Sequence, residues 1–170
     1  VSMQELNKGA RRPADVPPSR LKKVGVVGAG FMGAGIAYVT AKAGLEVVLV
    51  DRDQEAADKG KAYSHKLVSD QIMKGRAKTA DRDALLGRIK ASADYADLTG
   101  CDLIVEAVFE DMAVKKEVFG KLDAVAKHGA ILATNTSYLD INEIAASTSR
   151  PQDVLGLHFF SPANVMKLLE

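Results

Sequence analysis

Residues 22–33 read KKVGVVGAGFMG, an apolar run followed by the pattern G-x-G-x-x-G at Gly28, Gly30 and Gly33. This pattern indicates a dinucleotide site when it follows a strand and opens a helix, and here the helical pattern Gly30–Gly44 follows a strand-like run. In that context Gly28 permits the tight turn, Gly30 lets the backbone approach a pyrophosphate, and Gly33 lets the helix pack closely on the sheet. The helix N-terminus offers N–H groups and a positive dipole end to the phosphates. The alternative is a glycine-rich turn without a ligand.

An acidic residue, Asp51, ends the next strand-like run, 18 residues beyond Gly33. A carboxylate there accepts hydrogen bonds from both hydroxyls of an adenosine ribose and repels a 2′-phosphate, which favours NAD over NADP. Arg52 would be able to receive such a phosphate, but we expect Asp51 to dominate and Arg52 to lie over the adenine ring. The alternative role for Asp51 is the N-cap of the following helix.

Strand-like and helical patterns alternate along the chain, which predicts an α/β, Rossmann-type fold, a doubly wound, mainly parallel sheet with helices on both faces. We expect one domain over residues 21–170, preceded by a linker or tail over Val1–Arg20, which holds three of the five prolines. The expected strands are Lys22–Gly28, Leu45–Asp51, Ile89–Ala93, Asp102–Val108, Ala130–Thr134 and Val154–Phe160. The expected helices are Gly30–Gly44, Gln54–Lys74, Thr79–Gly87, Asp111–Lys127 and one from about Asp140.

The composition excludes several classes of protein. The 170 residues include 23 Lys and Arg against 22 Asp and Glu, and the net charge of +1 argues against a nucleic-acid-binding surface. Cys101 is the only cysteine, so no disulfide forms within the chain. No apolar run reaches the roughly 18 residues that span a bilayer, and the first twenty residues lack the apolar segment of a signal peptide. We therefore expect no nucleic-acid partner, no membrane span and no metal site.

Ligands of doubly wound sheets lie beyond the carboxyl ends of the strands, so the residues just after the later strands are candidates. Glu110 and Asp111 follow the strand Asp102–Val108, and Lys115 lies near the start of the next helix. These residues either face the crevice or form an ordinary helix start, in which Asp111 pairs with Lys115 at i,i+4. Glu106 lies inside the apolar strand and needs a partner if it is buried, but the sequence names none.

The segment Asn135–Ser137 follows the next strand. Ser137 either caps the next helix or faces the crevice. Asp140, with Glu143 three residues later, is the better cap, which leaves Ser137 for the crevice.

One of the three histidines is a candidate base. His65 is expected on a solvated helix face and His128 at a helix end, whereas His158 lies near the end of a buried-type strand, at the mouth of the crevice. His158 is either a core histidine or a catalytic base. Glu170, twelve residues later, would orient the imidazole and strengthen it as a base.

Four segments go beyond these generic patterns. They are VGAGFMGAGIA (Val27–Ala37), DLIVEAVFEDMAVKKEVF (Asp102–Phe119), ATNTSYLDI (Ala133–Ile141) and GLHFFSPANVMKLLE (Gly156–Glu170). Together they resemble the 3-hydroxyacyl-CoA dehydrogenase family, from about Leu21 to the last residue. The form with serine at position 161 is most similar to multifunctional enzymes in which an enoyl-CoA hydratase half precedes the dehydrogenase half, and the proline-bearing start fits the connection between such halves.

The resemblance implies roles for individual residues. His158 is the general base, Glu170 is its partner, and Ser137 hydrogen-bonds near the reacting centre. Many members have Asn where Ser161 stands, and serine retains the ability to hydrogen-bond. The cofactor contacts predicted from pattern and resemblance together are Gly28, Gly30, Phe31, Met32, Gly33, Asp51, Arg52, Val108, Phe109, Glu110, Lys115, Asn135, Ser137 and Ser161.

The implied reaction is the oxidation of a 3-hydroxyacyl-CoA to a 3-ketoacyl-CoA by NAD+ in fatty-acid β-oxidation. The resemblance further implies a helical C-terminal dehydrogenase domain that is absent from this chain, an oligomeric full-length enzyme, and little or no activity for the chain alone. Lys59, Lys66 and Lys74 are candidates to receive CoA phosphates, or are simply solvated lysines. The implied location is the cytoplasm in a bacterium, and the mitochondrion or peroxisome in a eukaryote.

Two alternatives stay open at this point. A non-catalytic NAD-sensing module explains the glycine loop and Asp51 but gives no purpose to the segment from His158 to Glu170. A hydroxyacid dehydrogenase of a neighbouring family also begins with G-x-G-x-M-G, but Asp51 and the HFFSP segment argue against it.

Overall fold

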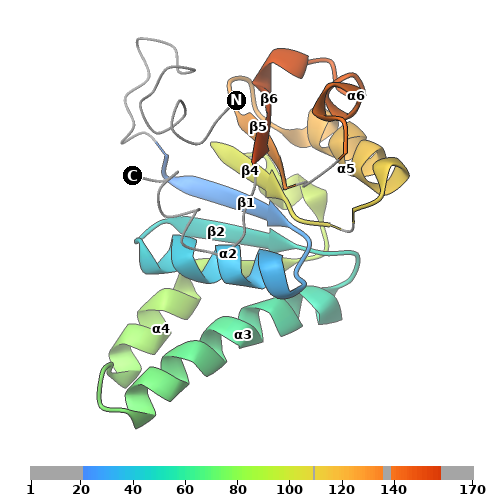
Figure 1. Ribbon diagram of the computed structural model, residues 1–170. Coiled ribbons are helices and arrows are strands. Elements are labelled where there is room, and N and C mark those ends of the chain that lie inside the picture. The colour runs from blue at the N-terminus through green and yellow to red at the C-terminus, as the bar shows by residue number, and fades with distance from the viewer. Residues whose placement is uncertain (1–20, 109, 136–138, 158–170) are drawn as a thin grey trace.

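The computed structural model describes residues 21–108, 110–135 and 139–157; the predicted linker, residues 1–20, lies outside them. The strands are β1 (Lys23–Val27), β2 (Glu46–Val50), β3 (Ile89–Ser92), β4 (Leu103–Glu106), β5 (Ile131–Asn135) and β6 (Val154–Leu157). They form one parallel sheet in the order β3-β2-β1-β4-β5-β6, which confirms the predicted fold class (Figure 1). The order reverses between β1 and β4, and ligands of such sheets bind at this switch point, beyond the carboxyl ends of the strands.

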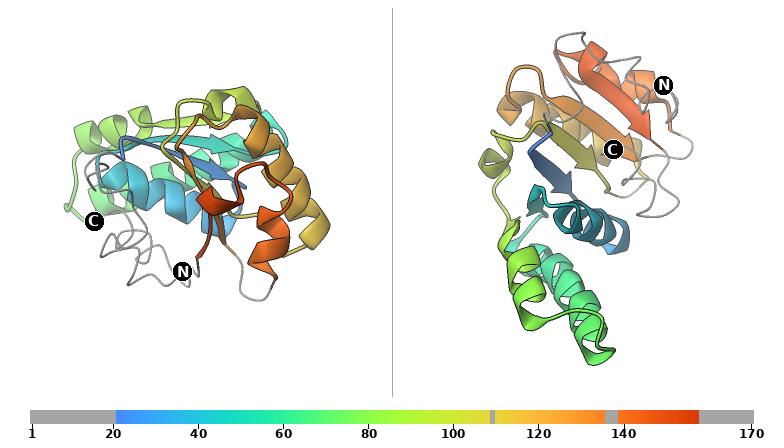
Figure 2. Two further views of the ribbon diagram at one scale, coloured as in Figure 1. Left: turned by 90° about the horizontal axis from the view of Figure 1, so that it is seen from above. Right: turned by 90° about the vertical axis from the view of Figure 1, so that its left-hand side faces the viewer.

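Helices cover both faces of the sheet (Figure 2). Helices α2, α3 and α4 contribute to the core on one face, and α5, α6 and the 3-10 helix η2 contribute to the core on the other. The hairpin formed by α3 and α4 extends past the sheet, away from β4, β5 and β6 (Figures 1 and 2). The bounds are α2 (Phe31–Lys42), α3 (Gln54–Met73), α4 (Thr79–Gly87), η2 (Tyr95–Leu98), α5 (Met112–Val125), α6 (Ile141–Ala145) and the 3-10 helix η3 (Pro151–Asp153).

The central strands are buried on both sides, as in other parallel sheets. In β1, Val24 and Val26 belong to the core beneath α2. Gly25, between them, faces the opposite core, where an added Cβ would lie 2.6 Å from Leu98 Cδ2 and 3.2 Å from Cys101 Sγ. Cys101 is buried with a free thiol, and burial raises the pKa of that thiol to about 11.

Aspartates begin three of the helices. Asp53 at α3, Asp111 at α5 and Asp140 at α6 each accept a hydrogen bond from a backbone N–H of the first turn. The predicted cap at Asp140 is therefore confirmed. Glu143 does not complete a capping box; its carboxylate pairs with Lys116 Nζ of α5 at 2.5 Å.

Several predicted elements extend too far. The strand predicted to reach Val108 ends at Glu106, because the backbone N–H of Val108 donates to Glu106 Oε2 at 2.7 Å and not to a neighbouring strand. The helix predicted to reach Lys127 ends at Val125, and Gly129, with φ of +86°, lies in the turn before β5. The two 3-10 helices were not predicted, since single turns leave no periodicity to detect.

Candidate functional site

The glycine loop between β1 and α2 has the close packing that its sequence predicts. Gly28 has φ of +103°, which favours glycine, and a Cβ there would lie 2.7 Å from the carbonyl oxygen of Ala107. A Cβ on Gly33 would lie 1.6 Å from the carbonyl oxygen of Gly28, so α2 approaches the loop only because this residue has no side chain. At Gly30, by contrast, no described atom lies within 4 Å of the Cβ position. The loop is therefore closed toward the protein and open in front of Gly30.

The N-terminus of α2 is suited to an anion. Gly30 is the N-cap, and within the described residues no side chain caps this helix and no acid lies in its first turn. Its first N–H groups and the positive end of the dipole are thus left for a bound group. Phe31 is 78 % exposed beside this end, with its ring 5.9 Å from that of Tyr63 in α3. A backbone cradle without side chains, next to a helix N-terminus, fits the pyrophosphate of NAD.

Asp51 connects the end of β2 to the glycine loop. Its Oδ2 accepts a hydrogen bond from the backbone N–H of Ala29 at 2.8 Å, and its Oδ1 accepts a hydrogen bond from the backbone N–H of Arg52 at 2.6 Å. Each carboxylate oxygen has a second lone pair, so Asp51 retains the capacity to accept from two ribose hydroxyls. The alternative role of Asp51 as a helix N-cap is wrong, because Asp53 caps α3. The exposed side chain of Arg52 lies with Nε 3.6 Å from Asp53 Oδ2.

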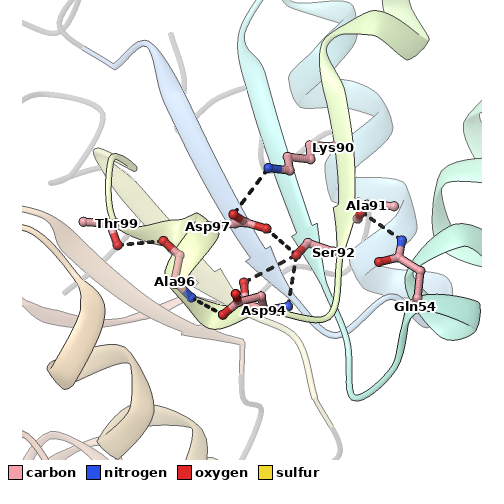
Figure 3. Close-up of polar contacts among 8 residues, drawn as sticks. All are labelled: Gln54, Lys90, Ala91, Ser92, Asp94, Ala96, Asp97 and Thr99. Carbon is pink, nitrogen blue, oxygen red and sulfur yellow. Dashed lines mark hydrogen bonds and ion pairs between the residues drawn. The ribbon is translucent and has the colours of Figure 1, made fainter.

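Figure 3 shows the polar contacts that hold the turn after β3, at the outer end of this half of the sheet. Ser92 Oγ donates to Asp97 Oδ2 at 2.5 Å, and this hydrogen bond, together with Lys90 Nζ at 3.3 Å from Oδ1, lowers the pKa of Asp97. The side chain of Gln54 donates to the carbonyl oxygen of Ala91 at 3.0 Å. The Gln54 contact joins the start of α3 to β3, and the contacts of Asp97 join β3 to η2. The backbone N–H of Asp51 donates to the carbonyl oxygen of Ser92 at 3.2 Å, which ties Asp51 to the end of β3.

A buried ion pair lies at the carboxyl ends of β4 and β5. Glu106 and Lys115 are both 0 % exposed, and Lys115 Nζ lies 2.6 Å from Glu106 Oε2. The other carboxylate oxygen, Oε1, accepts from the hydroxyl of Thr134 at 2.5 Å. Burial raises the pKa of Glu106, and the Lys115 ammonium, the Thr134 hydroxyl and the Val108 N–H act in the opposite direction. Glu106 thus has the partner that the sequence did not reveal.

The predicted local pair between Asp111 and Lys115 is wrong. Asp111 caps α5, and Lys115 turns back over the end of β4, because its ammonium reaches two acids and a carbonyl there. The available signal was an acid inside an apolar strand followed, nine residues later, by a lysine near the start of the next helix. Because an isolated buried charge is strongly disfavoured, an acid in a buried strand needs a positive partner. Lys115 could therefore be inferred as the partner of Glu106.

Three further residues predicted as cofactor contacts, Glu110, Asn135 and Val108, lie around this ion pair. Glu110 Oε1 lies 3.4 Å from Lys115 Nζ. The same ammonium donates to the backbone carbonyl oxygen of Asn135 at 3.0 Å. Val108 packs against the core beneath α5 and donates its N–H to Glu106. The structure therefore brings Val108, Glu110, Lys115 and Asn135 together at the carboxyl ends of β4 and β5.

The predicted catalytic residues lie outside the described part of the chain. These are His158, Glu170 and Ser137, and the predicted cofactor contacts Phe109 and Ser161 lie outside it as well. Their roles stay predictions. Of the other histidines, His65 is exposed on α3, as expected.

Residues 21–108, 110–135 and 139–157 contain no group of three or more His, Cys, Asp or Glu side chains placed to hold a metal ion. They also contain no helix long and apolar enough to cross a bilayer.

The sequence matches a known family over most of its length. Residues 23–170 match the family model described as 3-hydroxyacyl-CoA dehydrogenase, NAD binding domain. The 3-hydroxybutyryl-CoA dehydrogenase of Clostridioides difficile is 45% identical over 148 residues, which cover 87% of this chain and 53% of that protein. The peroxisomal bifunctional enzyme of Cavia porcellus is 45% identical over 150 residues, which cover 88% of this chain and 20% of that protein.

A solved structure gives the same picture. The crystal structure of (S)-3-hydroxybutyryl-CoA dehydrogenase from Ralstonia eutropha matches with a TM-score of 0.79 and 39% sequence identity, over 84% of this chain and 50% of that one. The chain therefore spans about half the length of these two hydroxybutyryl-CoA dehydrogenases.

Proposed function

This chain belongs to the 3-hydroxyacyl-CoA dehydrogenase family as its NAD-binding domain, and we propose that it serves an enzyme that oxidises a 3-hydroxyacyl-CoA to the 3-ketoacyl-CoA in fatty-acid β-oxidation. The observation that carries the proposal is the contact between Asp51 Oδ2 and the Ala29 N–H. The contact holds the Asp51 carboxylate beside the glycine loop, and this supports a site for the adenosine ribose of NAD next to its pyrophosphate.

Each half of the cofactor has its own set of residues in this proposal. The glycine loop and the start of α2 bind the pyrophosphate, and Asp51 binds the adenosine ribose. The cluster around Glu110 and Lys115 would hold the nicotinamide side, and NAD+ would supply the hydride acceptor there. His158 acts as the general base toward the substrate hydroxyl, Glu170 orients and stabilises it, and Ser137 hydrogen-bonds near the reacting centre. General-base assistance of this kind contributes about 100- to 10,000-fold in rate.

The substrate class rests on the relatives. Two of the matched proteins are named as hydroxybutyryl-CoA dehydrogenases and one as a peroxisomal bifunctional enzyme, which supports an acyl-CoA substrate and a place in β-oxidation. We propose residues 21–170 as one domain of a longer, oligomeric enzyme in which a helical C-terminal domain completes the acyl-CoA cleft. The exposed side chains of Lys59, Lys66 and Lys74 on and beyond α3 are candidate contacts for the CoA phosphates. A peroxisomal or mitochondrial location in a eukaryote, or a cytoplasmic one in a bacterium, accompanies this role.

The first test measures cofactor choice on the chain itself. NADH and NADPH are titrated against the chain by nicotinamide fluorescence, and NADH should bind more tightly because Asp51 repels a 2′-phosphate. Asp51→Ala should raise the Kd for NADH about tenfold, which corresponds to the loss of about one good hydrogen bond. Asp53→Ala is the matched control, since it removes a helix cap two residues away and should leave the Kd unchanged. Tighter binding of NADPH would contradict the proposed role of Asp51.

The second test measures turnover in the longer enzyme. With acetoacetyl-CoA and NADH, that enzyme should consume NADH, and His158→Ala should lower the rate about 100-fold or more while NADH binding is retained. Binding of NADH without turnover of any 3-ketoacyl-CoA would favour the alternative of a non-catalytic NAD sensor.

A further inference from the structure

The Glu106 carboxylate is a junction of three chain segments that approach the nicotinamide side. Its oxygens accept from Lys115 Nζ of α5 at 2.6 Å, from the Val108 N–H after β4 at 2.7 Å, and from the Thr134 hydroxyl of β5 at 2.5 Å. All three donors are directed at a carboxylate that is 0 % exposed. Such a group reaches a bound cofactor only through its neighbours.

These contacts use main-chain groups that would otherwise extend the sheet. The Val108 N–H bonds to Glu106, so the chain leaves the ladder after β4. Lys115 Nζ, which pairs with Glu106, also donates a hydrogen bond to the carbonyl oxygen of Asn135 at 3.0 Å. Asn135 is the last residue of β5. Glu106 therefore determines where two strands end and where the two following segments begin.

Glu106 also lies beside the other half of the site. In the sheet it pairs with Val27 of β1, and the next residue, Ala107, donates its N–H to the carbonyl oxygen of Val27 at 2.8 Å. The carbonyl oxygen of Ala107 lies 2.7 Å from the Cβ position of Gly28. The backbone around Glu106 thus fixes the spacing between the glycine loop and the nicotinamide side.

From these contacts we propose that Glu106 is a positioning residue for the nicotinamide half of the cofactor site. It holds the segments that carry Val108, Glu110 and Asn135, and it sets the place of the Lys115 ammonium. The proposal rests on the proposed function, because it assumes that NAD binds at the switch point. Its specific content is that the loss of Glu106 impairs binding of the nicotinamide half and spares the adenosine half.

The test compares two ligands on the same chain. NADH reports both halves of the site, whereas ADP-ribose lacks the nicotinamide and reports the adenosine half. In Glu106→Gln the side chain loses its charge and keeps one acceptor oxygen, and its NH2 donor faces either the Thr134 hydroxyl or the donors of Lys115 and Val108. We expect the Kd for NADH to rise about tenfold and the Kd for ADP-ribose to stay within about twofold.

A matched control lies at the opposite end of the same strand. Asp102, just before β4, pairs with Lys127 Nζ at 2.5 Å and accepts the backbone N–H groups of Lys22 and Lys23 at 2.9 and 3.1 Å. Asp102→Asn removes a comparable set of contacts at the amino-terminal edge of the sheet, away from the ligand. It should lower stability and leave both Kd values unchanged.

Two further variants separate position from charge. Thr134→Val retains the ion pair and removes only the hydroxyl donor, so it should fold and should raise the Kd for NADH about threefold. Glu106→Gln combined with Lys115→Met removes both charges of the fully buried pair, so stability should recover relative to either single variant while the defect in NADH binding persists.

The outcomes are distinguishable. An equal rise of both Kd values in Glu106→Gln, or no rise in either, would overturn the positioning role. Recovery of NADH affinity in the double variant would also overturn it, since Glu106 would then only neutralise Lys115. Failure of the unaltered chain to bind NADH would instead contradict the proposed function.

Discussion

The two halves of the candidate site, on either side of the switch point, are built from different chemical groups. In the adenosine half, backbone groups and the absence of side chains make the cradle, and Asp51 attaches to that backbone from the end of β2. In the nicotinamide half, the side chains of Glu106, Lys115 and Thr134 meet in a region withdrawn from water. The first half is sensitive to added atoms, and the second is sensitive to the loss of a charge partner.

The largest effect is expected in the nicotinamide half, where the buried ion pair of Glu106 and Lys115 lies. Lys115→Met leaves the Glu106 carboxylate buried without its ammonium, and the free energy of unfolding should fall by about 3–5 kcal/mol. The neighbouring Lys116→Met removes a half-exposed ion pair with Glu143 and should change stability by about 0–1 kcal/mol. Urea denaturation of both variants measures the difference, and equal losses would show that burial of the pair contributes nothing particular.

The same variant has a characteristic dependence on pH. Burial raises the pKa of Glu106 in the folded state, and the removal of Lys115 takes away the positive charge that opposes this rise. The folded protein then binds a proton on Glu106 more readily than the unfolded chain does, so acid favours folding at this residue. Stability of Lys115→Met relative to the unaltered chain should therefore improve as the pH falls from 7 to 5.

The next largest effect is expected in the adenosine half, where the glycine loop packs closely against α2. In Gly33→Ala the new Cβ would lie 1.6 Å from the carbonyl oxygen of Gly28, so α2 must move, at a cost of about 1–3 kcal/mol in stability. In Gly30→Ala no described atom lies within 4 Å of the new Cβ, so the variant should be as stable as the unaltered chain. Its NADH binding should be weaker, because the methyl group occupies the space in front of the loop. Thermal unfolding with and without NADH checks the pair, and a fully stable Gly33→Ala would disprove the close approach of α2.

A smaller effect tests charge at the opposite edge of the sheet. Burial alone would raise the pKa of Asp102, but Lys127 and the N–H groups of Lys22 and Lys23 outweigh it and lower this pKa. A lowered folded pKa stabilises the protein above the unfolded value, about 4, and this contribution is lost as the pH falls through the folded pKa. Asp102→Asn should lose about 1 kcal/mol at pH 7 and show a shallower decline of stability below pH 4. Denaturation curves from pH 3 to 7 measure this decline. If stability falls as steeply with pH in Asp102→Asn as in the unaltered chain, Asp102 does not have the lowered pKa assigned to it.

The smallest effect is expected on the exposed face of the α3–α4 hairpin. Lys59 Nζ lies 3.5 Å from Glu55 Oε1 in an exposed i,i+4 pair. Lys59→Ala should change the free energy of unfolding by less than about 0.5 kcal/mol. A larger loss of unfolding free energy in urea denaturation would contradict the expectation that the exposed pair contributes much less to stability than the buried pair.

The difference between the halves also explains how much could be predicted from sequence. Gly28, Gly33 and Asp51 follow a linear pattern whose steric meaning is local, so both the fold and the close packing of the glycine loop were predictable. The pairing of Lys115 with Glu106 depends on how α5 packs over β4, and the local i,i+4 rule favoured Asp111 instead. A tertiary contact that brings a lysine over the end of another element leaves no periodic trace in the sequence.

Cys101 provides an intrinsic reporter for these comparisons. Its thiol is the only one in the chain and lies in the core beside Gly25, where burial raises its pKa to about 11 and so lowers the fraction of thiolate. An alkylating reagent reacts with the thiolate of an accessible cysteine, so the native chain should be labelled slowly and the unfolded chain rapidly. The rate of modification at this one atom follows the opening of the core, and mass spectrometry can follow it without any attached dye.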